Sequence, residues 1–407
     1  MPDLVAMLKG VPGPLRHRCS QCDKTSSDLF RCSACQGVRY CTPQHQTEHW
    51  SVHESACRRI KQATKLLEFT TPGKSIGYAW GVMSTRDYMR ARLELSRQLA
   101  NLNTLDGVMQ SYQHRREMLT LCRSDQLGLR IILPAIMLRL DLDLECYHFV
   151  KWWSTYDAVG QYDMGHNSWP CLHVTAHAAD AFEDPSFLLG TFPELNHLVA
   201  VFLLKLKLLM DVVTTKVARK VLAHCGLIRD LHQDIESGVV RSPLSAQLCR
   251  KDANALHQME TKLSGQIQRI AAKIALTNSN FFVYLFNPDK ALTTTPEAYS
   301  SGSWDEMALA IQFSYATFWE TEGLLPLLNN ARACAARGFG SDIRDTMESS
   351  ASKASKDGHR TVNGSLKDAS ISRMWDYLTY AVTDASFLGP WSKRPSKRYF
   401  RRAASGV

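Results

Sequence analysis

Along most of the chain, apolar residues recur every three or four positions, which is the spacing of a helix with one buried face. In the first half, this pattern predicts helices over about residues 84–99, 104–123, 126–141 and 146–153. In the second half, it predicts helices over about residues 195–235, 243–278, 304–320 and 323–337. We expect Pro134 to kink or split the third of these helices and Gly226 to interrupt the fifth. The predicted fold class is therefore mostly α.

Short connections join the helical segments of the first half, which favours antiparallel helical hairpins. This arrangement is compatible with a helical-hairpin repeat, although no period of about 34 residues recurs clearly. We expect a flexible lead-in over residues 1–17, a small segment of different chemistry over 18–58 and a large helical domain over 59–340. Beyond it, the composition predicts a disordered linker over 347–369, one helix over 370–390 and a loose basic tail over 391–407.

The chain is long enough to bury a sizeable core. Its 407 residues, 45% of them apolar, indicate one larger domain or two beside the small segment. The most apolar stretch, residues 198–213, contains Lys205 and Lys207 and is shorter than the ~20 residues that cross a bilayer. We therefore expect a buried helix there and no membrane span.

The formal net charge of +9 is modest for this length, and much of it is concentrated near the C-terminus. The basic residues of that run are Lys393, Arg394, Lys397, Arg398, Arg401 and Arg402. Such a run is typical of a nuclear-import signal or a nucleic-acid contact, but we favour a solvated tail.

Eight potential metal ligands lie within residues 19–57, in four close pairs: Cys19 and Cys22, Cys32 and Cys35, Cys41 and His45, His53 and Cys57. Two cysteines with two residues between them in a tight turn, or two ligands four positions apart on a helix, aim both side chains at one ion. Four thiolate or imidazole ligands complete a closed zinc site, so this segment has ligands for two zinc ions. Because so short a segment buries little apolar surface, we infer that zinc supplies much of its folding free energy.

Two other uses of these cysteines are a disulfide framework and scattered buried thiols. The regular spacing argues against both. Charged residues and prolines interrupt the first fifteen residues, so no signal peptide is apparent. We therefore expect reduced thiols in an intracellular protein of the nucleus or cytoplasm.

The order of the pairs, with Tyr40 before Cys41, Gln46 after His45 and Trp50 three residues before His53, resembles the MYND zinc finger. In that family the two sites interleave. The resemblance implies that Cys19, Cys22, Cys41 and His45 bind one ion and that Cys32, Cys35, His53 and Cys57 bind the other. Spacing alone leaves open a sequential arrangement, in which the first two pairs bind one ion and the last two bind the other.

The family usually has cysteine at the position of His45. Histidine there gives each site three thiolates and one neutral imidazole, and a net charge of minus one with Zn²⁺, so His45 remains our predicted ligand. His49 is the competing candidate, because His45, His49 and His53 follow one another at helical i to i+4 spacing.

Some proteins with this finger are lysine methyltransferases with a SET domain, and the sequence argues against that activity. The SET domain begins before the finger, but only eighteen residues precede Cys19, and the expected Asn-His-Ser-Cys motif is absent. No hydrolase, zinc-protease or phosphate-loop motif occurs either. Cys171, His173 and His177 lie close together in sequence but lack another ligand pair. We expect no catalytic activity.

The resemblance instead implies binding, since fingers of this family bind short proline-containing peptides. Ser33, Gln46 and Trp50 stand at positions that family members use: Trp50 would offer an apolar face, and the other two would hydrogen-bond the peptide backbone. Trp50 also has a structural alternative, as a cover between the metal core and the next helix. The ligand order differs from that of DNA-reading fingers, which argues against nucleic acid. The expected function is an adaptor or regulator with a protein or peptide partner; the sequence indicates no oligomeric state.

Overall fold

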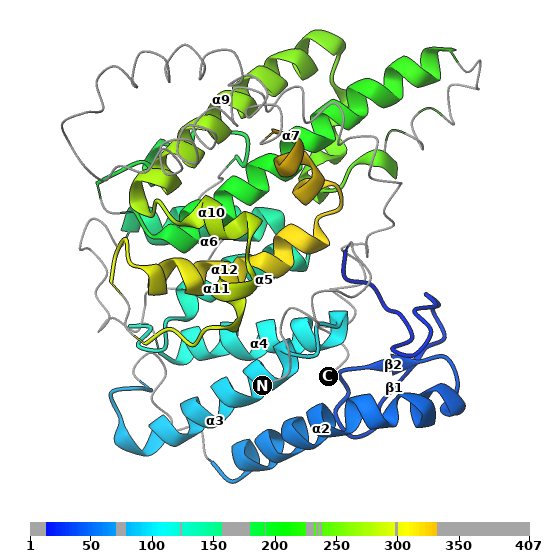
Figure 1. Cartoon of the computed structure of the whole chain (residues 1–407), viewed down its shortest axis with the longest axis vertical. Helices are drawn as coiled ribbons and strands as arrows, with labels where there is room; N and C mark the ends of the chain where they lie inside the picture. The colour runs from blue at the N-terminus through cyan, green and yellow to red at the C-terminus, as the bar shows by residue number, and fades with distance from the viewer. Residues whose placement is uncertain are drawn as a thin grey trace, which may run out of the picture. The chain divides into compact units, whose positions relative to one another are not determined.

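The computed structural model describes residues 14–70, 79–122, 124–156, 180–191, 193–224, 232, 236, 238–297 and 300–331. Within these ranges the chain is mostly helical, with one two-stranded antiparallel sheet (Figure 1). The chain divides into two compact units, to which the described residues 14–156 and 180–331 belong. The predicted mostly α fold class is confirmed.

The first unit begins with the small sheet and a long helix. Strands β1 (Phe30–Arg31) and β2 (Arg39–Tyr40) pair with Phe30 opposite Tyr40. Helix α2 (Pro43–Glu68) follows at once, because Thr42 accepts a hydrogen bond from the His45 amide at 3.2 Å and Pro43 stands at the first helical position. This helix of 26 residues starts inside the cysteine-rich segment and packs against α3 (Met83–Ala100).

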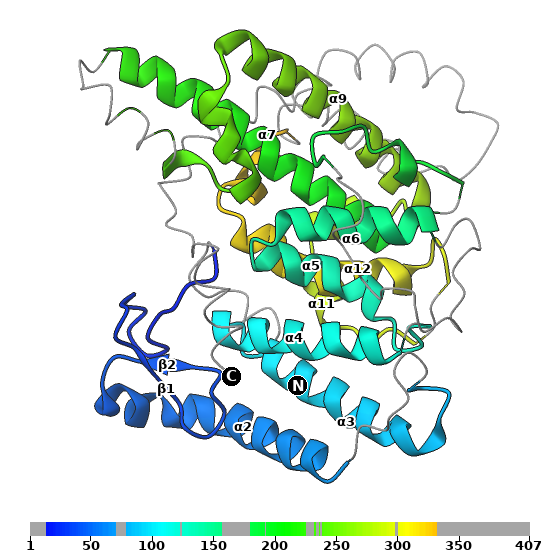
Figure 2. The ribbon, with the colours of Figure 1, turned by 180° about the vertical axis from the view of Figure 1, so that it is seen from behind.

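Four further helices complete this unit: α3 (Met83–Ala100), α4 (Leu105–Leu121), α5 (Leu129–Arg139) and α6 (Asp143–Tyr156). Each packs against the next along the chain, and Figures 1 and 2 show α2, α3 and α4 side by side in that order. Two polar caps start the middle helices: Thr104 accepts from the Gly107 amide, and Asp125 accepts from the amides of Leu129 and Arg130. The turns between these helices are short and start the next helix with a polar cap, so each helix packs against its neighbour in the chain.

Two glycines permit close approaches within this unit. A Cβ atom at Gly107 would lie 2.5 Å from the Leu99 carbonyl oxygen, so α3 and α4 pack closely only because a side chain is missing there. A Cβ atom at Gly37 would lie 2.2 Å from Leu102, and the Thr104 hydroxyl donates to the Gly37 carbonyl. The segment between β1 and β2 is therefore held against the turn that joins α3 to α4.

The second unit is built on α7 (Leu195–His224), which packs against α9 (Ala253–Thr277) and α12 (Trp304–Glu320). The shorter elements are η2 (Ser186–Leu188), η3 (Pro243–Arg250), α10 (Phe281–Phe286) and α11 (Asp289–Thr293), and residues 324–331 are also helical. Residues 198–213 are buried throughout, as predicted. Lys205 is fully buried and donates to the carbonyls of Ala181 and Glu183 at 2.6 and 2.8 Å, and burial lowers its pKa to about 7.

No described helix combines the length and the apolar character that crossing a membrane requires.

Two of the predicted helices differ from the structure. The helix predicted over 243–278 is divided, because η3 ends at Arg250 and Asp252 starts α9 by accepting a hydrogen bond from the Ala255 amide at 2.7 Å. Helix α5 is not split at Pro134, which lies inside it. The predicted linker, C-terminal helix and basic tail over 347–407 lie outside the described residues.

Candidate metal centre

The structure brings the eight Cys and His residues together in two groups of four. Within each group, all ligand atoms lie within 4.8 Å of one another. One group contains Cys19, Cys22, Cys41 and His45, and the other contains Cys32, Cys35, His53 and Cys57. The pairs interleave along the chain, as the resemblance implied, and the sequential alternative does not occur. Within the described ranges, no third such group is present.

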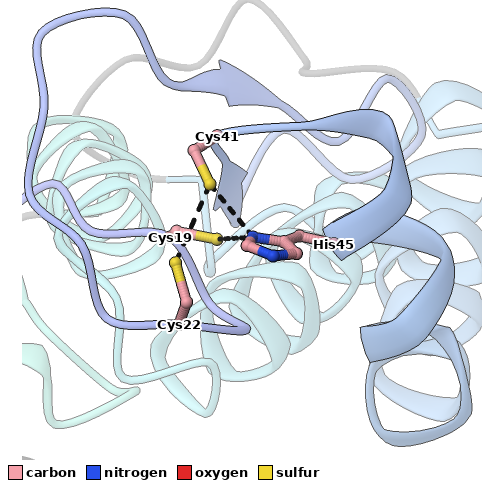
Figure 3. Close-up of side chains that lie close together, drawn as sticks. All are labelled: Cys19, Cys22, Cys41 and His45. Carbon is pink, nitrogen blue, oxygen red and sulfur yellow. Dashed lines mark hydrogen bonds between the residues drawn. The ribbon is translucent and has the colours of Figure 1, made fainter.

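The first group has the spacing of a tetrahedral zinc site (Figure 3). The Sγ atoms of Cys22 and Cys41 are 3.7 Å apart, and the His45 Nδ1 atom lies 3.6 Å from Cys19 Sγ and 3.0 Å from Cys41 Sγ. Zinc–ligand bonds of about 2.3 Å to sulfur and about 2.0 Å to nitrogen place tetrahedral S···S pairs about 3.8 Å apart and S···N pairs about 3.5 Å apart. Three thiolates and one imidazole at these separations fit a zinc ion.

The second group has the same donor set and is buried. Cys32 Sγ and Cys57 Sγ are 3.9 Å apart, and Cys35 Sγ lies 3.4 Å from His53 Nε2. His53 and Cys57 stand four residues apart on α2, so both side chains leave the same face of one helix. All four residues are at most 4% exposed, which protects a bound ion from solvent.

The two Cys-x2-Cys pairs share one turn geometry. In the first, the Asp23 amide donates to the Cys19 carbonyl at 2.9 Å; in the second, the Gln36 amide donates to the Cys32 carbonyl at 2.9 Å. Asp23 and Gln36 both adopt left-handed backbone conformations, with φ of 56° and 54°. The left-handed residue after each second cysteine turns the chain back, so both thiols of a pair face one point.

Burial shifts the pKa values of two ligands in the second group, Cys35 and His53. It raises the pKa of the Cys35 thiol to about 12, and burial together with His49 lowers the pKa of His53 to about 4. Without a cation, the Cys35 thiol is therefore protonated and the His53 imidazole neutral at neutral pH. Zinc requires thiolates and neutral imidazole, so binding releases protons and its affinity falls as the pH falls.

His49, the competing candidate ligand, belongs to neither group. Its Nδ1 atom is hydrogen-bonded to the Tyr40 hydroxyl at 3.0 Å, and its ring stacks on His53 with centroids 5.9 Å apart. His49 therefore contacts a ligand of the second group rather than an ion.

A buried ion-pair network joins the finger, residues 19–57, to α4. Asp106 is 2% exposed, and its Oδ2 and Oδ1 atoms accept from Arg39 at 2.6 and 3.0 Å. Arg31 lies 2.8 Å from the same Oδ1 atom. Apolar residues of the finger also share one core cluster with Leu95 and Leu99 of α3. Sequence reasoning missed Asp106, because it lies 67 residues from Arg39 and no local pattern marks it.

Each predicted peptide-contact residue stands next to a metal ligand, either in the chain, as Ser33 and Gln46 do, or by a ring contact, as Trp50 does. Trp50 is 41% exposed and meets the His53 ring edge-on at 6.2 Å, so it covers a ligand and still offers an apolar face. Ser33 is exposed and Gln46 is half-buried. Cys171, His173 and His177 lie outside the described residues.

When the chain is compared with known families and proteins, the match is confined to the finger. Residues 19–57 match the MYND finger family, so the predicted resemblance is confirmed, and the two clusters are its zinc-binding sites. No curated protein and no solved structure matches the chain.

Proposed function

We propose that this protein is an adaptor or regulator that binds short, proline-containing peptides through its MYND finger. A MYND finger is a zinc-binding protein-interaction module, and the finer assignment to proline-containing peptides rests on Trp50. An indole ring that is 41% exposed over a rigid metal site is a preformed surface on which a proline ring packs.

Two polar side chains near the metal groups support this proposal. Ser33 follows Cys32 in the second metal group, and Gln46 follows His45 in the first, so both are held in place by ligands. Neither side chain hydrogen-bonds another residue within the described ranges, and Ser33 is exposed. Both are available for the backbone of a bound peptide.

The test is a proline-rich peptide library screened against the full chain, with selected ligands measured by calorimetry. Trp50→Ala is expected to weaken binding by about tenfold or more, as truncation of an aromatic anchor does. Val52→Ala is the matched control, since Val52 is 73% exposed on the same helix and stands at no predicted contact position. Equal affinities of wild type and Trp50→Ala, with two zinc ions retained, would refute the peptide surface.

The proposed role is binding without catalysis, in the nucleus or cytoplasm. It rests on the missing methyltransferase motifs and on thiols that must stay reduced to hold zinc. Saturable binding of S-adenosylmethionine would contradict the proposed absence of catalysis. Nucleic acid is not the proposed partner; a strongly salt-dependent DNA affinity that is lost when the C-terminal arginines are neutralised would contradict this.

A further inference from the structure

The two metal groups differ in how far solvent reaches their thiols. In the first group, Cys22 is exposed and Cys41 is partly exposed, while Cys19 is fully buried. In the second group, every ligand is at most 4% exposed. The donor set is the same in both groups, three thiols and one imidazole. Exposure is therefore a property that separates two otherwise matched sites.

The separation between neighbouring sulfur atoms does not distinguish the groups. Cys22 Sγ and Cys41 Sγ lie 3.7 Å apart in the first group (Figure 3), and Cys32 Sγ and Cys57 Sγ lie 3.9 Å apart in the second. Each pair would have to approach by less than about 2 Å to reach the length of an S–S bond, about 2.05 Å. The finger thus holds one exposed and one buried thiol pair of nearly equal spacing.

Exposure matters because an oxidant reacts with a thiolate only when it reaches the sulfur atom. The thiolate is the nucleophilic form of cysteine, and zinc binds its cysteines as thiolates. Susceptibility to oxidation follows thiolate character and exposure together. With zinc bound, Cys22 has both properties, whereas Cys32 and Cys57 have thiolate character without exposure.

We propose that Cys22 and Cys41 are a modification site, at which hydrogen peroxide forms a disulfide and releases the zinc ion of the first group. The Cys22 thiolate attacks one peroxide oxygen, the O–O bond breaks, and Cys22 becomes a sulfenic acid while hydroxide leaves. The Cys41 thiolate then attacks the Cys22 sulfur, forms the S–S bond and displaces a second hydroxide. The two sulfurs together lose the two electrons that peroxide gains, and both hydroxide ions are protonated to water.

Zinc leaves the first group because the disulfide removes two of its four ligands. Cys19 and His45 remain, and two ligands do not complete a closed zinc site. The second group keeps all four of its ligands and its zinc ion. A dithiol reductant cleaves an exposed disulfide by thiol exchange. Both thiolates are then restored, so the first group binds zinc again.

The test is to treat the full chain, loaded with two zinc ions, with hydrogen peroxide and to record the released zinc with a chromophoric chelator. One zinc ion per chain is expected in solution, and the chelator without peroxide gives the background. Mass-spectrometric mapping of the oxidised chain should find a disulfide between Cys22 and Cys41, with Cys32 and Cys57 unmodified. Dithiothreitol followed by zinc should return the zinc content to two ions per chain.

Cys22→His is the informative variant, because an imidazole replaces the exposed thiolate and four ligands remain. Peroxide should release zinc from this variant at least about tenfold more slowly than from the wild type, since the attacking thiolate is gone. Cys122→Ser is the matched control. Cys122 is a buried thiol that belongs to neither metal group, so its replacement should leave the rate unchanged.

Three results would overturn the proposal: peroxide releases neither zinc ion or both at one rate, the Cys22–Cys41 disulfide is absent, or Cys22→His loses zinc as fast as the wild type. If Cys22→His binds a single zinc ion, the mapped disulfide of the wild type decides. Zinc content and disulfide are both measured without a peptide. Failure of this site is therefore distinguishable from failure of the peptide surface.

Discussion

Replacing Asp106 with alanine tests whether the finger and the helices after it fold as one unit. Asp106 is the only carboxylate that the structure pairs with both Arg31 and Arg39 within the described residues. The Arg39 side chain is 14% exposed, so Asp106→Ala removes a buried carboxylate that pairs with a nearly buried guanidinium. Breaking a buried pair in this way costs about 3–5 kcal/mol, whereas the half-exposed Arg31 contributes at most about 1 kcal/mol.

We therefore expect Asp106→Ala to lower the free energy of unfolding of the first unit by about 3–5 kcal/mol. The assay is denaturant unfolding followed by circular dichroism, with zinc release recorded in parallel by a chromophoric chelator. In the wild type, zinc release should coincide with the loss of helix from this unit, because finger residues share a core cluster with Leu95 and Leu99. In the variant, both signals should move together to lower denaturant.

Asp87→Ala is the matched control. Asp87 also pairs with an arginine, Arg90 at 3.4 Å, but its side chain is 79% exposed. Its removal should change the unfolding free energy by less than about 1 kcal/mol. The reasoning is refuted if Asp106→Ala costs no more than Asp87→Ala, or if zinc leaves in a transition separate from the helices. The double variant Arg39→Gln with Asp106→Asn should recover part of the loss, since no buried charge then remains unpaired.

Three further predictions concern the metal, the packing and the pH dependence. Elemental analysis should find two zinc ions per wild-type chain, one in His45→Ala and two in His49→Ala, because only His45 belongs to a ligand group; equal zinc contents in the two variants would contradict the assignment. Gly107→Ala should destabilise the first unit by about 1–3 kcal/mol in denaturant unfolding, because the new methyl group would meet the Leu99 carbonyl at 2.5 Å; an unchanged midpoint would show that α3 and α4 have room. Burial lowers the pKa of His114 from 6.5 to about 4, so the unfolded chain takes up the proton first and stability falls as the pH falls from 6.5 to 4. For this partly exposed ring the loss should be about 1–2 kcal/mol. Zinc release also lowers stability in acid, so the unfolding free energy is measured against pH for both wild type and His114→Gln. The wild type should show the steeper slope, and equal slopes would contradict the prediction.

Much of the local structure was predictable because its causes are local. Helices α3, α4 and α12 follow from an apolar spacing that lies within each segment. The break between η3 and α9 was missed although its signal is local: Asp252 stands three residues before Ala255, whose amide it caps. The apolar stripe continues across that break and so predicts one helix where the cap starts a second.

Sequence alone also determined which residues form the metal centre and which donors it has. The two ligands of each pair are aimed at one ion by their spacing in a turn or helix, independently of the rest of the chain. Three thiolates and one imidazole are a donor set that zinc prefers. Spacing did not decide which pairs share an ion, because interleaved and sequential pairings use the same ligands. The short sheet and the first turns of α2 decided it, by placing Cys41 and His45 beside Cys19 and Cys22.

Only the tertiary structure revealed which charged residues interact with partners that are distant in the sequence. Asp106 is one acidic residue among many in the sequence, and it becomes the link between finger and α4 only when Arg31 and Arg39 fold against it. Arg115 is likewise an ordinary helical arginine until packing of α4 against α3 buries it and brings its Nε atom to the Ser96 hydroxyl. The free energy of a charge depends on its burial and on the charges around it, and both are set by packing rather than by neighbours in the chain.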